Sequence, residues 1–318
     1  MADDTREIEA ADLWSNEFDL SLFADKEINV NVTGSLSDYV KNLAARIVVN
    51  DTHDLHRIWS SRLSDGQLDA VKNPHTVALV TDNAGPELVA DLCLAEYLIQ
   101  SGFTSRVVFY PKAIPWYVSD VTANDITWLL DEGLSAKFLA APLVPLARKW
   151  AEKWRARFSN GHFIVRESPF WTYSCPYGEM AKVNPKLYEE LTTGVDVILF
   201  KGDLNYRKIL ADRTWRPDCV KQKQAAFRGM QFGRPTDSTG RLTCSCSPSA
   251  SPGFPVDCRC PMKTSQNWPP LLCALRIAKA DVAVGLTPET LSRVRAESND
   301  WWIIGRYGII QIVSPIQL

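Results

Sequence analysis

The chain alternates short apolar runs with longer amphipathic stretches, a pattern typical of strands alternating with helices. Residues 77–81 are a β-branched apolar run that leads directly into Asp82-Asn83-Ala84-Gly85. Pro86 suits the first turn of a helix over residues 87–100, and Gly102 suits its end. Residues 106–110 form the next apolar run. This order predicts a strand–helix–strand unit, which builds parallel sheets.

The same alternation continues along the chain. Helices are expected over residues 121–132, over 135–158 with breaks near Pro142 and Pro145, and from Leu204. Further strands are expected at residues 162–165, 195–200, 281–284 and 309–313. Such alternation predicts an α/β protein: a three-layer αβα sandwich with a largely parallel, Rossmann-like sheet.

Two segments depart from this rhythm. Residues 1–75 are polar and irregular apart from a helical pattern around 36–49, and we interpret them as a remnant of an N-terminal helical region. Residues 76–318 form the α/β domain. Within it, residues 216–262 are rich in Pro, Ser and Gly and are expected to be a low-order insertion.

Cysteine usage divides along the same line. Cys93, Cys175 and Cys273 lie in apolar surroundings and are predicted to be small core residues. The others gather in the insertion, and four of them form two C-x-C pairs: Cys244, Cys246, Cys258 and Cys260. Zinc binding by these four and reduced thiols in a loose loop both remain open.

Charge and composition narrow the partners. The chain has 318 residues, with 35 Lys plus Arg against 37 Asp plus Glu and a net charge of -2. This balance gives no electrostatic reason to expect nucleic acid or an anionic membrane. No apolar run approaches the roughly 18 residues of a membrane span, and the acidic N-terminus has no apolar core of a signal peptide. The expectation is a cytoplasmic protein, with the nucleus left open and no obligate protein partner inferred.

Polar side chains follow the predicted strands, and ligands of open α/β sheets bind beyond such carboxyl ends. The polar residues at these places are Asp82, Asn83, Lys112, Asp120, Lys201, Asp203, Asn205, Arg207, Lys208, Arg276 and Lys279. Asp82, Asn83 and Asp120 offer hard oxygen ligands suited to a divalent ion. Basic groups around such an ion would neutralise a phosphate, which is what phosphoryl transfer requires.

Each residue also has a purely structural interpretation. Asp82-Asn83-Ala84-Gly85 is a common turn sequence, and Asp120 and Asp203 can each cap a following helix. Arg207 and Lys208 can be surface charges. Spacing alone leaves both interpretations open.

Four motifs appear in order and carry a family resemblance. They are Asp82-Asn83-Ala84-Gly85-x-Glu87, residues 114–120 (IPWYVSD), residues 201–208 (KGDLNYRK) and residues 279–286 (KADVAVGL). Leu13-Trp14-Ser15-Asn16 and Gly305-Arg306-Tyr307-Gly308 fit the same pattern. Together they resemble the subfamily III damage-control phosphatases, also called the acidic-residue methyltransferase family. The resemblance covers about residues 8–215 and 270–315.

The resemblance implies a site and an activity. Asp82, Asn83 and Asp120 would be the catalytic residues and would hold Mn²⁺ or Ni²⁺, with Co²⁺ or Mg²⁺ as alternatives. The substrate would contact Glu87, Asp203, Leu204, Asn205, Tyr206, Arg207 and Lys279. The substrate would be a small reactive sugar phosphate of the fructose 1-phosphate or fructose 6-phosphate type. A carboxyl methyltransferase using S-adenosylmethionine is the first alternative, and a catalytically impaired metal-binding remnant is the second.

The chain departs from the family pattern in three places. The family has a long helical region before the Leu-Trp motif, whereas here Leu13 lies close to Met1, so we expect a shortened member with a largely missing helical cap. The family motif Arg-Thr-x-Lys is replaced by Arg276-Ile277-Ala278-Lys279, which lacks the hydroxyl. Residues 216–262 also stand where ordered family sequence is expected.

Overall fold

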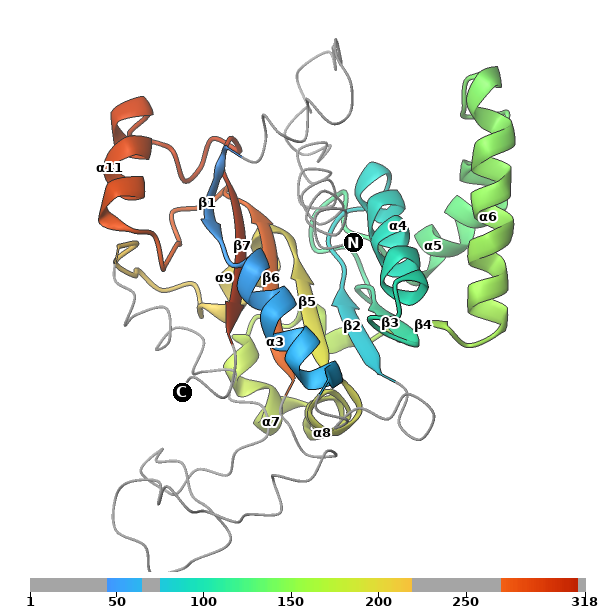
Figure 1. Ribbon diagram of the computed structural model, residues 1–318, viewed down its shortest axis with the longest axis horizontal. Helices are drawn as coiled ribbons and strands as arrows, with labels where there is room; N and C mark the ends of the chain where they lie inside the picture. The colour runs from blue at the N-terminus through green and yellow to red at the C-terminus, as the bar shows by residue number, and fades with distance from the viewer. Residues whose placement is uncertain (1–44, 65–74, 219–269, 314–318) are drawn as a thin grey trace, which may run out of the picture.

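A seven-stranded sheet forms the centre of the protein, in the strand order β1-β7-β6-β5-β2-β3-β4 (Figure 1). A computed structural model of the chain describes residues 45–64, 75–218 and 270–313. The strands are β1 (Ile47–Asn50), β2 (Thr76–Val80), β3 (Arg106–Tyr110), β4 (Phe163–Val165), β5 (Val197–Lys201), β6 (Leu271–Ile277) and β7 (Gly308–Val313).

The strand directions give a largely parallel sheet. Every pair is parallel except β6 with β7, which is antiparallel. The strands β6, β5, β2, β3 and β4 therefore run in one direction, and β7 and β1 run in the other. Every residue of β2, β5, β6 and β7 is buried, as expected for strands covered on both faces.

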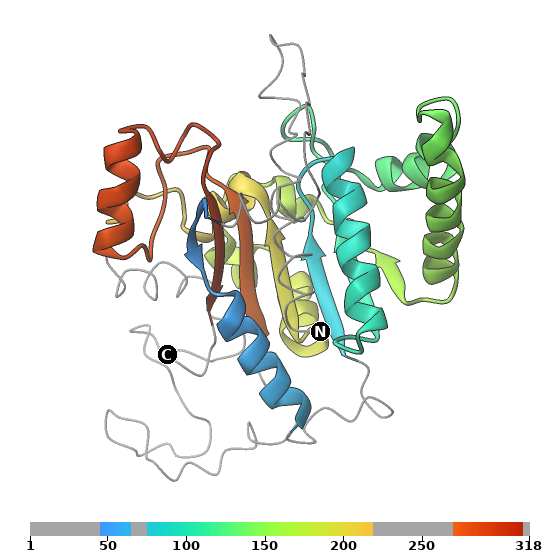
Figure 2. The same cartoon turned by 45° about the horizontal axis from the view of Figure 1, so that its top comes forward.

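Helices cover both faces of the sheet and complete the three layers (Figure 2). One face packs against α3 (Thr52–Ser64), α4 (Pro86–Gln100), α5 (Ala123–Trp128), the π-helical turn η3 (Leu129–Gly133) and α6 (Val144–Ser159), and the short η4 (Ala141–Leu143) precedes α6. The other packs against η5 (Pro169–Thr172), η6 (Tyr177–Glu179), α7 (Met180–Val183), α8 (Pro185–Gly194), α9 (Gly202–Ile209) and α11 (Pro288–Glu297). The predicted αβα sandwich is confirmed.

Two predicted elements are wrong. Of the predicted helix around 36–49, residues 36–44 lie outside the described residues, and residues 47–49 belong to strand β1 (Ile47–Asn50), which the unpredicted helix α3 follows. The run 281–284 is not a strand, although Val282, Ala283 and Val284 are buried. Side chains bind its backbone instead of a neighbouring strand: Arg276 donates to the carbonyl of Val282, and Gln311 donates to that of Val284.

The strand of this part of the chain is instead β6, which the sequence pattern did not predict. Its Arg276 looks out of place in a buried strand, yet the residue is fully buried. The guanidinium is neutralised by Asp203, with Nε 2.6 Å from Oδ1. It also stacks on the ring of Tyr206, whose centroid lies 4.5 Å away. The charged residue Arg276 therefore interrupts the apolar sequence of β6, and the strand is not recognisable from its pattern of apolar residues.

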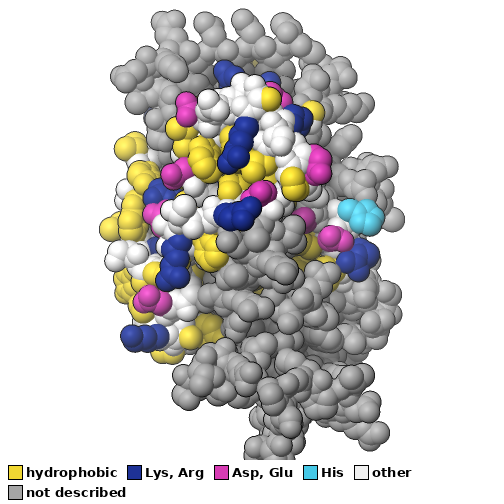
Figure 3. All heavy atoms as spheres, turned by 90° about the vertical axis from the view of Figure 1, so that its left-hand side faces the viewer, with side chains coloured by type: hydrophobic (Ala, Val, Ile, Leu, Met, Phe, Trp, Pro, Cys, Tyr) yellow, Lys and Arg dark blue, Asp and Glu magenta, His cyan; other side chains and the backbone are white. Residues whose placement is uncertain are grey.

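The surface that α11 contributes mixes positive and negative side chains with apolar ones (Figure 3). Arg293 and Glu297 of α11 form one exposed pair, with 3.3 Å between Nη1 and Oε1. In the described part of the chain, no helix is long and apolar enough to cross a membrane.

Candidate active site

The candidate site lies where the carboxyl ends of four neighbouring strands meet. Asp82 and Asn83 follow β2, Lys112 follows β3, Lys201 ends β5, and Lys279 follows β6. The chain proceeds from β2 to β3 and β4 on one side, whereas β5 and β6 lie on the other side of β2. The strand order thus reverses between β2 and β5, and open α/β sheets bind ligands at such a point.

Asp82, Asp120 and Lys112 form the centre of this edge. The Lys112 ammonium lies 3.4 Å from Oδ1 of Asp82 and 2.7 Å from Oδ1 of Asp120. The other oxygen of Asp120 accepts the backbone N–H groups of Trp116 and Tyr117, each at 2.8 Å. Asp120 does not cap the next helix, because Thr122 is the N-cap of α5. The interpretation of Asp120 as a helix cap is therefore wrong.

Asn83 is held with a defined orientation between these groups. Its Nδ2 donates to Asp82 at 3.0 Å and to Glu87 at 2.8 Å. Its Oδ1 accepts the hydroxyl of Ser119 at 2.7 Å. A β-bridge also joins the backbones of Asn83 and Asp120. Asn83 is thus brought together with Ser119, 36 positions further along the chain.

A second ionic group lies behind the first. The Lys201 ammonium is 3.0 Å from Oδ1 of Asp91 and 3.5 Å from Oε1 of Glu87, and all three side chains are buried. Glu87 and Asp91 are one turn apart on α4, so both face the sheet. This spacing of two acids on a buried helix face was the sequence signal that would have found Asp91.

The buried charges of the site do not balance. Asp82, Glu87, Asp91 and Asp120 are buried acids, whereas Lys112 and Lys201 are the buried lysines beside them. Their formal sum is two negative charges. Burial raises the pKa of Asp82 to about 7; Lys112 opposes this rise, Glu87 and Asp120 add to it, and Lys279 also opposes it. A site with this excess of negative charge favours a cation.

Gly202 brings the end of β5 directly against Asp82. It has φ of +83°, and a Cβ built on it would lie 1.8 Å from Oδ2 of Asp82. Only glycine allows both this backbone conformation and this approach. Asn205 fixes the same junction, because its Nδ2 donates to the carbonyls of Thr81 at 3.2 Å and Lys201 at 2.7 Å.

The predicted substrate-binding run on α9 points in several directions, since successive helix residues are rotated by about 100°. Asp203 faces β6 and accepts Nε of Arg276 and the backbone N–H of Lys279. Asn205 and Leu204 are buried. The Tyr206 hydroxyl donates to Gln311 of β7 at 2.8 Å, inside the core. Arg207 turns outward to Asp212, with 2.7 Å between Nη2 and Oδ2.

The structure therefore brings only part of the predicted set together. Asp82, Asn83, Glu87 and Asp120 are joined by direct contacts, and Lys279 acts electrostatically on Asp82. Asp203 lies beside Lys279, and it is not a helix cap, because its carboxylate serves Arg276. The side chains of Leu204 and Tyr206 pack in the interior. The surface interpretation suits Arg207 but not Lys208, which is buried.

Several residues of the site had no assigned role from sequence. Lys112 and Lys201 were noticed only as basic residues after strands. Ser119 and Tyr177 were missed: Ser119 orients Asn83, and the Tyr177 hydroxyl donates to Asn205. Burial raises the pKa of Tyr177 well above its usual value, and the nearby Asp82 and Asp120 add to the rise. Nothing in the residues around Tyr177 signals this proximity.

The side chains of the site give two observations about metal binding. No group of three or more His, Cys, Asp and Glu among the described residues is arranged to hold a metal ion. Asp82, Asn83 and Asp120 combine two carboxylates with a carboxamide, a set of hard oxygen donors. The unbalanced negative charge around them fits a divalent cation. The four clustered cysteines and residues 219–262 lie outside the described residues; Cys93, predicted to be buried, is exposed, whereas Cys273 is buried.

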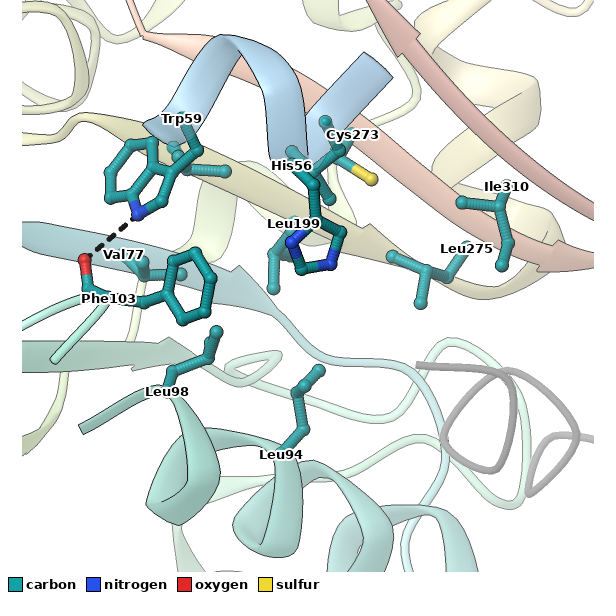
Figure 4. A pocket seen from close by; sticks show the side chains of 12 residues that line it. His56, Trp59, Val77, Leu94, Leu98, Phe103, Leu199, Cys273, Leu275 and Ile310 are labelled. Atoms are coloured by element: carbon teal, nitrogen blue, oxygen red, sulfur yellow. Dashed lines mark hydrogen bonds between the residues drawn. The ribbon is translucent and has the colours of Figure 1, made fainter. Parts of the chain in front are cut away.

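A cavity of about 40 Å³ lies elsewhere, between α3, α4 and the sheet (Figure 4). Its lining is almost entirely apolar, with Trp59 and Phe103 at one side and Leu275 and Ile310 at the other. His56 is the one ionisable lining side chain apart from Cys273. The cavity offers no set of charged groups that could bind a phosphate. The site at the strand ends is therefore the candidate active site.

Comparison with known proteins identifies the family of the chain. Residues 2–294 match the family described as "Damage-control phosphatase ARMT1-like domain". The chain belongs to the damage-control phosphatase ARMT1-like family. Among its relatives are the proteins named "Damage-control phosphatase ARMT1" from Danio rerio, 33% identical over 306 residues, and from Homo sapiens, 33% identical over 310 residues.

These alignments cover 95% and 96% of the chain but only 56% and 57% of the two relatives. The chain thus spans a little over half the length of the ARMT1-like proteins it matches. The family match includes all the strand-end residues described above, from Asp82 to Lys279.

Proposed function

We propose that the chain is a divalent-metal-dependent phosphatase that hydrolyses small reactive sugar phosphates, of the fructose 1-phosphate or fructose 6-phosphate type. The observation that carries this proposal is the buried acidic cluster, in which four acids lie beside two buried lysines, at the point where the strand order reverses. Membership of a family of damage-control phosphatases supports the reaction type.

The residues present would divide the work as follows. Asp82, Asn83 and Asp120 would hold one Mn²⁺ or Ni²⁺ ion, or Co²⁺ or Mg²⁺. When bound, such an ion supplies charge stabilisation to phosphoryl oxygens and activates water. Lys112 keeps Asp82 and Asp120 at a fixed separation by contacting both. Ser119 and Glu87 hold the carboxamide of Asn83 with its oxygen and nitrogen in fixed positions.

Lys279 would bind the phosphoryl group on the side facing β6. Its backbone is fixed by Asp203, and its side chain is near enough to lower the pKa of Asp82. In hydrolysis, water attacks phosphorus, the bond from phosphorus to the sugar oxygen breaks, and that oxygen takes up a proton. The negative charge that develops on the phosphoryl oxygens is what a fixed ammonium stabilises.

The direct test is hydrolysis of fructose 1-phosphate and p-nitrophenyl phosphate with and without Mn²⁺. We expect activity that requires the ion and is lost in Asp82→Asn. Asp54→Asn, an exposed acid on α3, is the matched control and should keep full activity. Methyl transfer from S-adenosylmethionine to protein carboxyl groups, with no phosphate release, would favour the methyltransferase alternative. Metal binding without either activity would indicate a catalytically impaired remnant.

A further inference from the structure

Lys208 on α9 is a buried lysine next to the candidate site that the proposed mechanism does not use. The residue is 7% exposed. Its ammonium donates to the backbone carbonyls of Trp171, at 3.4 Å, and Tyr173. It also lies over the rings of Trp116 and Tyr177, 5.0 Å and 5.2 Å from their centroids.

No Asp or Glu among the residues that the structure describes forms an ion pair with Lys208. The other buried lysines, Lys112 and Lys201, each contact two acids. An ammonium has three N–H donors, and the two carbonyls use two of them. Burying a charge without a counter-ion costs free energy, so such a lysine is expected either to bind an anion or to lose its proton.

The position of Lys208 ties it to the strand-end site. Trp116 is held by Asp120, which accepts its backbone N–H, so the ring over Lys208 belongs to the loop that carries a proposed metal ligand. Tyr177, the other ring, donates its hydroxyl to Asn205 at the junction of β2 and β5. Burial lowers the pKa of Lys208 to about 8; nearby Cys175 opposes this and the positive charge of Lys112 adds to it.

We propose that Lys208 binds a second anionic group of the substrate, a phosphate or a carboxylate, beside the phosphoryl group that is removed. This rests on the proposed function and extends its substrate class to sugar phosphates that carry a second phosphate or a carboxylate. The aromatic faces of Trp116 and Tyr177 stabilise the ammonium while no anion is present, because ring quadrupoles attract cations. An incoming anion accepts the third N–H and supplies the missing counter-charge.

The test compares Lys208→Gln with the wild type. Glutamine keeps an N–H for the carbonyls but removes the charge, and Lys208→Met removes both. Lys182→Met is the control, because Lys182 is an exposed lysine on the neighbouring helix α7. KM is measured with Mn²⁺ for fructose 1-phosphate, for fructose 1,6-bisphosphate and for a phosphorylated sugar acid; the last two compare phosphate with carboxylate as the second anion.

We expect Lys208→Gln to raise KM for the doubly anionic substrates by about tenfold or more, as for a lost charge-assisted contact. KM for fructose 1-phosphate should stay within about twofold. An equal effect on all three substrates, or none on any, would overturn the proposal. Loss limited to Lys208→Met would also overturn it, because only the contacts to the carbonyls would then matter.

A binding measurement separates this proposal from the phosphatase itself. Calorimetric titration with inorganic phosphate, in the absence of metal, should detect tighter binding to the wild type and to Lys182→Met than to Lys208→Gln, in which Lys279 remains as a phosphate contact. If the wild type binds phosphate in this way and shows no hydrolysis, the anion site stands and the proposed function fails. Equal phosphate binding by wild type and Lys208→Gln would refute the anion site whatever the activity.

Discussion

At the scale of single residues, the contact between Gly202 and Asp82 is the tightest constraint on the site. Gly202 has a positive φ and no room for a Cβ, because the Asp82 carboxylate occupies that space. Gly161 has a similar φ of +73°, but nothing lies within 4 Å of the position of its Cβ. Substituting either glycine therefore has the same backbone cost in free energy. Only at Gly202 would the added Cβ also collide with the Asp82 carboxylate.

This difference gives a matched pair of variants. Gly161→Ala should lower the free energy of unfolding by about 1 kcal/mol, the cost of a left-handed backbone. Gly202→Ala should lower it by about 3 kcal/mol or more, because the carboxylate must also move. Chemical denaturation of both variants measures the difference. Equal losses would show that Asp82 can move aside freely.

Lys279 is the residue on which the catalytic proposal depends most directly. Removing its ammonium should lower kcat on fructose 1-phosphate by about 10²-fold, a typical loss for one electrostatic partner of the reacting group. Metal binding should persist in Lys279→Ala, because Asp82, Asn83 and Asp120 remain. The measurement is kcat at saturating Mn²⁺, with the melting shift by Mn²⁺ as control. Rates within a factor of about two would make Lys279 a surface charge.

At the scale of elements, α4 connects the site to the outer helix α6. Glu96 of α4 is buried and accepts Nε and Nη2 of Arg157 on α6, at 3.0 Å and 2.7 Å. Lys153 of the same helix lies 3.2 Å from Oε1 of Glu96. Burial opposes ionisation of Glu96, but its bonds to Arg157, Gln100 and Lys153 prevail and lower its pKa.

This pairing predicts a pH-dependent contribution to stability. A carboxyl group with a lowered folded-state pKa stabilises the fold above its unfolded value of 4.5, and the contribution is lost as pH falls through the folded-state value. Glu96→Gln should lower the free energy of unfolding at pH 7 by about 1–2 kcal/mol, since the cations are partly exposed. At low pH the wild type and variant should converge. A constant difference across the pH range would contradict the ionic origin.

At the same scale, helix geometry explains why the residues of α9 contact different parts of the protein. A helix turns each successive side chain by about 100°, so residues adjacent in sequence face different partners. Asp203 serves the Arg276 and Lys279 segment, Asn205 joins β2 to β5, and Tyr206 enters the core. The motif is contiguous in sequence but forms three separate contacts in space.

At the scale of the whole molecule, the charge balance of the interior predicts a response to metal. A ligand that binds only the folded state at about 100 times its Kd stabilises it by about 2.7 kcal/mol. For a protein of this size, that corresponds to a rise in Tm of several degrees. We expect Mn²⁺ to raise Tm of the wild type, and Asp82→Ala to abolish the shift. Equal shifts in both would place the ion elsewhere.

Much of the architecture followed from the sequence alone. The predicted strands at 77–81, 106–110 and 195–200 overlap β2, β3 and β5, because both faces of a parallel sheet are covered and the apolar runs are therefore continuous. The position of Asp82 and Asn83 after β2 was visible for the same reason. The order of the four motifs also sufficed to predict the family. These features depend on neighbouring residues, so a linear pattern records them.

Other features were decided by contacts between distant segments. Arg276 interrupts β6 in the sequence, and only its pairing with Asp203 and Tyr206 allows it to be buried in a strand. Residues 281–284 read as a strand because they are apolar, but side chains from β6 and β7 bind their backbone in place of a ladder. A pattern of apolar residues reports burial, and it does not report which partner satisfies the backbone.

The order of apolar and polar residues in the sequence thus determined the sheet, its helical layers and the presence of acids and bases at the strand ends. The tertiary structure decided which of those charges meet. Lys112 lies between Asp82 and Asp120, Lys201 lies between Glu87 and Asp91, and Lys208 is left with carbonyls and aromatic rings. Coulombic pairing depends on distance through space, and strands that are neighbours in the sheet are far apart in the chain.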